Sequence, residues 1–158
     1  MASSRFSAKT ALWFAAAALI AQTPSTGVLA IAPPAKVTVK RTAGAEQRLK
    51  LHLQSGYHMN SNTPGDSYLI PLKLTWGEGP LEAEGVAYPK PKMEKFEFSE
   101  KPMSIYDGEV ELVTKFKAKP GATPGPAVQL GKLRYQACTD KMCLPPKNLD
   151  VRLPVLVE

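Results

Sequence analysis

The stretch Arg48-Leu49-Lys50-Leu51-His52-Leu53 decides the fold, because its three leucines alternate with polar residues. Successive side chains of a β-strand point to opposite faces of the sheet, so this alternation predicts a strand with one buried and one solvated face. Strand-like stretches continue outward from it in both directions, at residues 36–41, 68–74, 109–116, 127–135 and 149–157. No window of about twelve residues shows a sustained helical period, and the pattern therefore predicts an all-β chain.

Turn-forming segments separate these stretches and indicate the architecture. They are rich in Gly, Pro, Ala and Asn and lie at residues 42–45, 60–65, 77–80, 119–126 and 145–146. The 15 prolines and 11 glycines, spread along the 158 residues, also exclude a protein of long helices. Seven or eight short strands in about 125 residues predict a single domain, an immunoglobulin-like antiparallel β-sandwich.

The first thirty residues have the organisation of a secretory signal peptide. Arg5 and Lys9 are basic, residues 11–21 are apolar, and Val28-Leu29-Ala30 provides a cleavage site. An uncleaved anchor is the alternative, but eleven apolar residues are too few to span a bilayer core of about 30 Å. We therefore expect residues 1–30 to be removed and residues 31–158 to form a soluble exported domain.

Charge and motif content exclude several classes of function. The chain has 20 Lys and Arg against 14 Asp and Glu, a net charge of +6, and the lysines between residues 90 and 119 are interleaved with glutamates. A nucleic-acid-binding surface needs clustered basic residues, so we expect no nucleic-acid partner. No hydrolytic constellation, phosphate loop or zinc spacing is present in the sequence, and we expect neither a cofactor nor a bound metal.

Both cysteines of the chain, Cys138 and Cys143, lie close together with four residues between them. In an oxidising compartment such a pair is a structural disulfide, a redox-active pair or a metal site. A ring this short stabilises a fold by only about 2 kcal/mol, against nearly 5 for a loop of about 100 residues. Short-range pairs are commoner where the bond opens and closes, so the spacing favours a redox-active pair over a structural one.

The segment around the cysteines resembles a known redox motif. Residues 135–146, Tyr-Gln-Ala-Cys-Thr-Asp-Lys-Met-Cys-Leu-Pro-Pro, resemble the motif of the N-terminal periplasmic domain of the thiol:disulfide interchange protein DsbD, which starts Tyr-Gln-x-Cys and ends Cys-x-Pro-Pro. Residues 56–64 running into 68–71, and residues 104–108, resemble further segments of the same family in the same order. The resemblance implies an immunoglobulin-like sandwich, in agreement with the strand pattern.

The resemblance also implies a thiol-disulfide oxidoreductase that acts as an electron relay in the periplasm. The family domain receives electrons through a thioredoxin-like domain from a membrane-embedded one, and reduces periplasmic isomerases and cytochrome-maturation proteins. By position, Cys143 forms the mixed disulfides and Cys138 is the resolving thiol. The chain ends at Glu158 without those further domains. We therefore expect a stand-alone monomer whose partners are thioredoxin-like proteins and a separate membrane thiol reductase.

A cap over the cysteines is a further expectation from the resemblance. The segment between Met93 and Met103 corresponds to a family loop whose aromatic residue covers the pair, here Phe96 or Phe98, and Tyr135 and Pro145 are candidate partner contacts. Aromatic side chains are usually core residues, which is the alternative for both phenylalanines.

Two other functions are compatible with the residue types. One is a passive immunoglobulin-like binding module with a structural disulfide, since sandwiches host many functions. The other is the handling of Cu(I), which soft ligands favour, although no His-x-Met or Met-x-x-Met cluster occurs. The candidate ligands are His52, His58, Met59, Met93, Met103, Met142, Cys138 and Cys143.

Overall fold

Two four-stranded β-sheets packed face to face make up most of the computed structural model, which describes residues 27–158. One sheet has the order β1-β3-β9-β6 and the other β2-β12-β10-β5. Their strands are β1 (Leu29–Ile31), β2 (Val37–Val39), β3 (Ala45–Leu53), β5 (Lys73–Trp76), β6 (Leu81–Ala87), β9 (Glu109–Ala118), β10 (Gly125–Tyr135) and β12 (Lys147–Val157). The all-β sandwich predicted from the sequence is confirmed, and within residues 27–158 no helix is long and apolar enough to cross a membrane.

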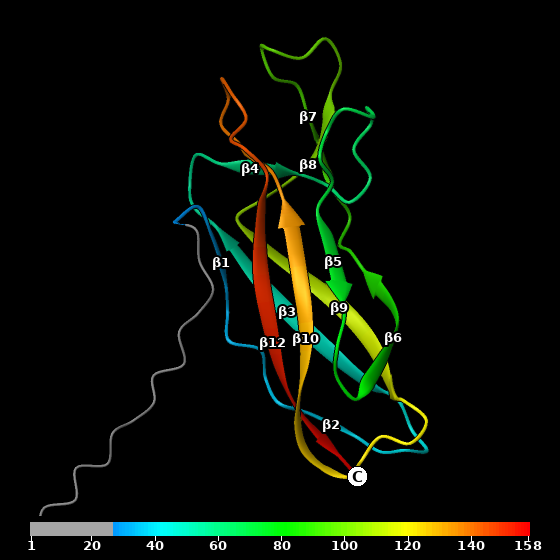
Figure 1. Cartoon of the computed structure of the whole chain (residues 1–158). Coiled ribbons are helices and arrows are strands. Elements are labelled where there is room, and N and C mark those ends of the chain that lie inside the picture. Colours follow the sequence, from blue (N-terminus) through cyan, green and yellow to red (C-terminus); the bar gives the residue numbers. More distant parts are fainter. Residues whose placement is uncertain (1–26) are drawn as a thin grey trace, which may run out of the picture.

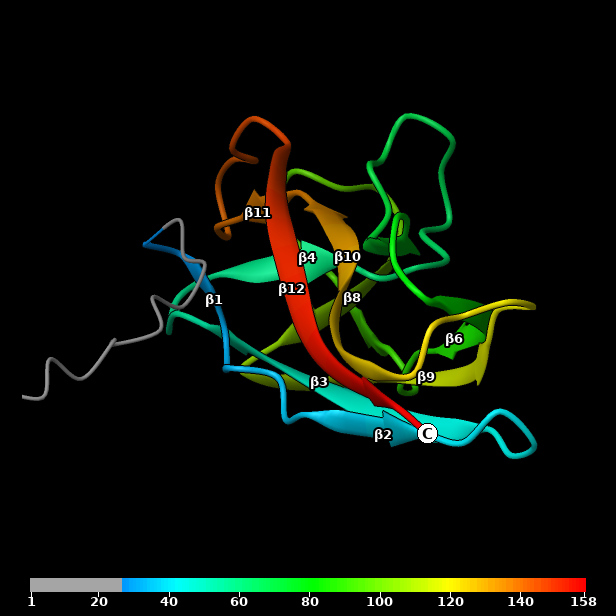
Figure 2. The ribbon, with the colours of Figure 1, turned by 60° about the horizontal axis from the view of Figure 1, so that its bottom comes forward.

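A third, smaller sheet lies at one end of the sandwich, opposite the end that holds the C-terminus (Figure 1). It has the order β11-β4-β8-β7. Its strands are β4 (His58–Asn60), β7 (Lys92–Glu94), β8 (Met103–Asp107) and β11 (Ala137–Cys138). Figure 2 shows β11 beside β4, near the start of β12. The second half of the cysteine motif therefore leads directly into the last strand of the sandwich.

The three leucines of residues 48–53 form the inner face of β3. Leu49, Leu51 and Leu53 are at most 1% exposed, whereas the polar residues between them face solvent. β3 pairs with β9 in antiparallel register, with Leu49 opposite Leu112 and Leu51 opposite Val110. Alternation along each strand thus supplies one leucine-rich layer of the core.

Contacts between the two large sheets centre on Trp76. Its indole N–H donates to Thr114 Oγ1 on β9 over 2.9 Å, and its ring meets Phe116 edge-on at 5.0 Å between centroids. On its own sheet the ring packs on Gly131, where an added Cβ would come within 2.7 Å of it. A glycine on β10 therefore makes room for the aromatic side chain that joins the sheets.

Several strand predictions need correction. The described residues form twelve strands rather than seven or eight, and one pair, β2 with β12, is parallel. The predicted strand at 68–74 begins only at Lys73. Residues 68–72 form a loop, because Pro71 has no N–H to donate and the Leu72 N–H donates to Ser61 O outside any ladder.

The first strand begins within the segment expected to be the signal peptide. In β1, Leu29 pairs with Leu53 and Ile31 with Leu51, and both side chains are at most 1% exposed. Cleavage after Ala30 would remove Leu29 and Ala30 from this strand. The rest of the expected signal peptide, residues 1–26, lies outside the described residues.

We predict that a chain starting at Ile31 is less stable than one starting at Val28. Burial of one leucine side chain contributes roughly 2 to 3 kcal/mol, and Leu29 is fully buried. Urea denaturation of the two chains should show a difference of at least this size in the free energy of unfolding. Equal free energies of unfolding would show that Val28, Leu29 and Ala30 contribute nothing to stability. Mass spectrometry of the protein expressed from the full sequence should correspondingly find an N-terminus before Leu29.

Candidate redox site

The two cysteines form a disulfide across a short hairpin. Cys138 and Cys143 are opposed in an antiparallel bridge with Cα atoms 3.9 Å apart. Backbone hydrogen bonds flank the pair on both sides, from Leu144 N–H to Ala137 O and from Thr139 N–H to Met142 O, each 2.8 Å long. The cysteines are thus a non-hydrogen-bonded pair, the position at which cross-strand side chains approach most closely. Four residues between the cysteines thus form a hairpin turn that brings the two side chains opposite each other.

The turn between the cysteines is held by Thr139. Its Oγ1 accepts the backbone N–H of Met142 over 3.2 Å and that of Lys141 over 3.3 Å. The exposed Pro145 and Pro146 follow, and β12 begins at Lys147, two residues before the strand predicted at 149–157. Cys138 itself belongs to a strand rather than to the turn, because it is part of β11 and pairs with β4.

The two cysteines differ in their accessibility to solvent. Cys138 is 0% exposed, whereas Cys143 is partly exposed at the end of the molecule. Met142, next to it, is 61% exposed. A partner can therefore approach Cys143 but not Cys138.

The small sheet has two faces with different roles. Ala137, Met59 and Tyr106 stand opposite one another on β11, β4 and β8, and all three pack into the core of the sandwich. The next row across the same strands is Cys138, His58 and Asp107. Because successive side chains alternate, this row faces away from the sandwich core. The register thus places the disulfide and His58 on one face, with Asp107 beside them.

A hairpin loop, residues 95–102 between β7 and β8, covers that face. Phe96 is 8% exposed and packs in a small separate cluster with Met103 and Ile105. Its ring stacks on His58 with centroids 4.1 Å apart, and the ring of Phe98 stacks on Phe96 at 5.4 Å. Phe98 is 44% exposed. The innermost phenylalanine therefore rests on the cross-strand neighbour of Cys138.

Polar residues from the segments 56–64, 104–108 and 135–146 brace the site. The Asn60 amide donates to Ile70 O and to Gln136 Oε1, and the Gln136 amide donates to Leu144 O over 3.1 Å. Ser61 and Ser104 share a buried hydroxyl–hydroxyl hydrogen bond of 2.8 Å. These bonds tie the loop before β5 and the cysteine hairpin to the small sheet.

A cavity of about 540 Å³ opens beside His58. Phe96 and three carboxylates, Glu94, Asp107 and Asp140, contribute to its lining. Burial lowers the pKa of the His58 imidazole below 6.5, and the three carboxylates oppose this effect without overcoming it. His58 is therefore neutral at pH 7.

We predict that the protein loses stability as the pH falls below about 6.5, over the range in which an unfolded histidine takes up a proton. The folded-state pKa of His58 lies below the unfolded value, so its contribution is fully present above 6.5 and is lost toward acid. Urea midpoints between pH 7.5 and 5 should show a smaller decline for His58→Phe than for the wild type. An unchanged decline in that variant would assign it to other groups.

The remaining predicted site residues lie in different places. Tyr135 is 1% exposed and belongs to the main core, so its side chain offers no surface to a partner. His52 is exposed on β3 near Glu109. Met59 and Met103 are buried, whereas Met93 and Met142 are exposed. Apart from His58, Cys138 and Cys143, the candidate copper ligands are thus dispersed, and no group of three or more His, Cys, Asp or Glu side chains within residues 27–158 is arranged to hold a metal ion.

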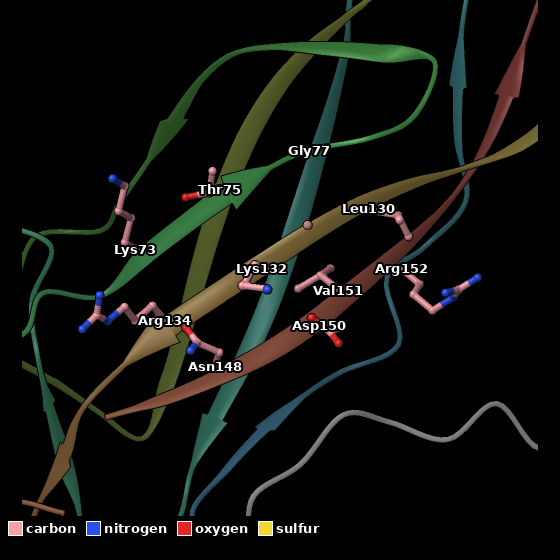
Figure 3. Close-up of a pocket in the computed structure, with 11 residues that line it drawn as sticks. Lys73, Thr75, Gly77, Leu130, Lys132, Arg134, Asn148, Asp150, Val151 and Arg152 are labelled. Carbon is pink, nitrogen blue, oxygen red and sulfur yellow. The ribbon is translucent and has the colours of Figure 1, made fainter. Parts of the chain in front are cut away.

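A second cavity, of about 640 Å³, lies away from the disulfide on the outer face of the β2-β12-β10-β5 sheet. Figure 3 shows its side chains rising from three neighbouring strands. Its lining includes four basic residues and one acidic residue, namely Lys73, Lys132, Arg134, Arg152 and Asp150. It contains neither cysteine nor any residue of the 95–102 loop, so it is not part of the redox site.

The sequence profile of one family, described as "Thiol:disulfide interchange protein DsbD, N-terminal", matches residues 28–154. The chain belongs to this family. A DsbD N-terminal domain with a Cys138–Cys143 disulfide is a thiol-disulfide interchange domain. The resemblance deduced from the cysteine motif is thereby confirmed.

Two solved structures are similar to this chain. The N-terminal periplasmic domain of ScsB from Proteus mirabilis has a TM-score of 0.56 at 15% identity, over 81% of this chain and 47% of that one. The chain thus spans about half the length of that domain. The N-terminal domain of Neisseria meningitidis DsbD in the reduced form has a TM-score of 0.45 at 16% identity, over 83% of this chain and 82% of that one. No curated protein sequence matches the chain. The immunoglobulin-like class predicted from the strand pattern is confirmed.

Sequence reasoning missed the roles of His58, Asp107 and Asn60 at this site. In the sequence, His58 stands out only as a candidate copper ligand and as part of segment 56–64, and Asp107 only as part of segment 104–108. The available signal was their position in the two DsbD-like segments, 56–64 and 104–108. Their proximity to Cys138 depends on pairing between β4, β8 and β11, which the sequence alone does not reveal.

Proposed function

We propose that the protein is a periplasmic electron relay. It takes electrons through Cys138 and Cys143 from a thioredoxin-like protein supplied by a membrane thiol reductase, and passes them to periplasmic disulfide-containing proteins, including those of cytochrome maturation. The observation that carries this proposal is the unequal pair, with Cys143 partly exposed and Cys138 buried, at the end of the sandwich. A structural disulfide would gain more by joining distant strands.

Reduction of the pair proceeds in two exchange steps. A thiolate of the donor attacks Cys143 Sγ, the intramolecular S–S bond breaks, and its electron pair leaves on Cys138. The second thiol of the donor then attacks the donor sulfur of the mixed disulfide and releases Cys143. Two electrons and two protons pass from the donor dithiol, which becomes a disulfide. Onward transfer runs through the same steps in reverse with an oxidised acceptor.

The 95–102 loop serves as a cap in this scheme. Phe96 is the capping residue, because its ring stacks on His58, the cross-strand neighbour of Cys138. Phe98 is the outer, exposed part of the cap. Docking of a partner at Cys143 displaces the loop. The loop stays closed toward small oxidants, which do not dock on it. Pro145 and Met142 border the approach to Cys143.

Export precedes this function. The residues before Leu29 act as the signal peptide. This boundary is earlier than Ala30, and the inclusion of Leu29 and Ala30 in β1 supports it. The exported domain works as a monomer.

Equilibration with a reduced thioredoxin-like protein tests the proposal. The fraction of Cys138–Cys143 reduced, followed by alkylation and mass spectrometry, should increase as the donor becomes oxidised in equal amount. A set of glutathione buffers should show the same pair titrating between oxidised and reduced forms. A disulfide that stays oxidised while the donor reduces its ordinary substrates would contradict the relay and favour a structural bond.

A further inference from the structure

His58 is a buried polar residue, and no contact in the structure explains why its ring carries the nitrogen Nε2. It is 6% exposed, and its Nε2 has no hydrogen-bond partner among the described residues. Burying a polar atom without a partner is costly. The stacking on Phe96 needs only an aromatic ring, which phenylalanine would supply without this cost. The nitrogen therefore calls for a second explanation.

The register puts this nitrogen-bearing ring next to the buried cysteine. His58 stands directly opposite Cys138 on β4 and β11, and directly opposite Asp107 on β4 and β8. Side chains of directly opposed residues project from the same face, with Cβ atoms about 4.5–5.5 Å apart. The row Cys138, His58, Asp107 thus has the order of a thiol, a base and a carboxylate.

The redox state of Cys138 changes what it can offer to this base. A disulfide sulfur has no proton to donate, so Nε2 is unpaired in the oxidised form. Reduction converts Cys138 into a thiol, whose S–H is a donor. The unpaired acceptor of the oxidised site then has a donor beside it.

We propose that His58 is the general base for the resolving thiol Cys138, a role that rests on the proposed function. In the reduced protein the Cys138 S–H donates to the imidazole. After Cys143 has formed a mixed disulfide with an acceptor, the imidazole takes this proton, and the Cys138 thiolate attacks Cys143 Sγ. The Cys138–Cys143 bond forms, the bond to the acceptor breaks, and the acceptor leaves as a thiolate that receives the proton.

The carboxylates around the His58 ring can stabilise a proton that the ring holds for a short time. Glu94 on β7, Asp107 on β8 and Asp140 in the cysteine turn all favour the imidazolium, whereas burial favours the neutral ring. Lys92 pairs with Asp107 and moderates its charge. The base is thus neutral when it must accept a proton and is surrounded by carboxylates once it has done so.

The decay of a preformed mixed disulfide between Cys143 and an acceptor isolates the resolving step. We expect His58→Phe to keep the stacked ring and to resolve about tenfold more slowly than the wild type near pH 7, the scale of one lost hydrogen bond or proton acceptor. The two rates should converge above about pH 8.5, where a free thiol ionises unaided. His58→Gln should also be slow, and His52→Phe, the matched change at the exposed histidine, should behave as wild type. An identical pH profile for His58→Phe and the wild type would overturn the proposal.

A second measurement keeps the inference independent of variant folding and of protein partners. In wild-type protein with ¹⁵N-labelled histidine, reduction by dithiothreitol should move the His58 Nε2 signal toward that of a hydrogen-bonded acceptor, and His52 should stay unchanged. An unmoved His58 signal refutes the role of His58 even if the relay works. A moved signal without exchange with any thioredoxin-like protein refutes only the relay.

Discussion

Cys138→Ser should accumulate a stable mixed disulfide through Cys143, and Cys143→Ser should accumulate almost none. Cys143 is the partly exposed sulfur that a partner reaches, and removal of Cys138 takes away the thiol that would resolve the adduct. In Cys143→Ser the remaining thiol, on β11 of the small sheet, belongs to a residue that is 0% exposed. Non-reducing gels with a thioredoxin-like partner that lacks its own resolving cysteine should show a difference of about tenfold or more in trapped complex.

The matched control is the double variant with both cysteines changed to serine, which should trap nothing. Thermal unfolding of both single variants shows whether each is folded during the assay, since the short disulfide contributes only about 2 kcal/mol. Equal trapping by folded Cys138→Ser and Cys143→Ser would mean that accessibility does not assign the two roles. The cysteine motif would then resemble that of the family without giving the same roles to the two thiols.

Phe96→Ala should accelerate oxidation of the reduced pair by a small-molecule disulfide by about tenfold or more, since each 1.4 kcal/mol removed from cap closure is a factor of ten. The ring of Phe96 stacks on His58 and fills the cluster with Met103 and Ile105, so its removal loosens the loop over the disulfide. Because this cluster is separate from the main core, the loss should appear as local opening rather than global unfolding. Stopped-flow oxidation and amide hydrogen exchange in residues 92–107 measure the two effects.

Phe98→Ala and Phe116→Ala provide the comparison. Phe98 is 44% exposed and should change oxidation less than Phe96 does. Phe116 is fully buried between the large sheets, so its truncation should cost roughly 3 to 5 kcal/mol of global stability without faster oxidation while folded. If Phe96→Ala resembles Phe116→Ala, with strong destabilisation and no faster oxidation, the 95–102 loop is packing and not a gate.

The predictability of each element follows from its length and pattern. The strands β3, β9, β10 and β12 contain 9 to 11 residues and alternate over most of their length, so period two was visible in the sequence. The short strands β4, β7 and β11 contain only 2 or 3 residues and show no alternation, being buried or exposed throughout. Strands this short form only because neighbouring chain segments supply hydrogen-bond partners, and local sequence carries no sign of them.

By itself the sequence determined the all-β class, the family, and the closeness of Cys138 and Cys143, because alternation, turn residues and a four-residue spacing are local properties of the chain. Only the tertiary structure decided which cysteine is buried, which phenylalanine stacks inward, and that His58 lies between Cys138 and Asp107. These features depend on the register between β11, β4 and β8, strands that are distant in the sequence. A shift of one residue in that register would turn Cys138 toward the sandwich core, so the pairing of these strands creates the site.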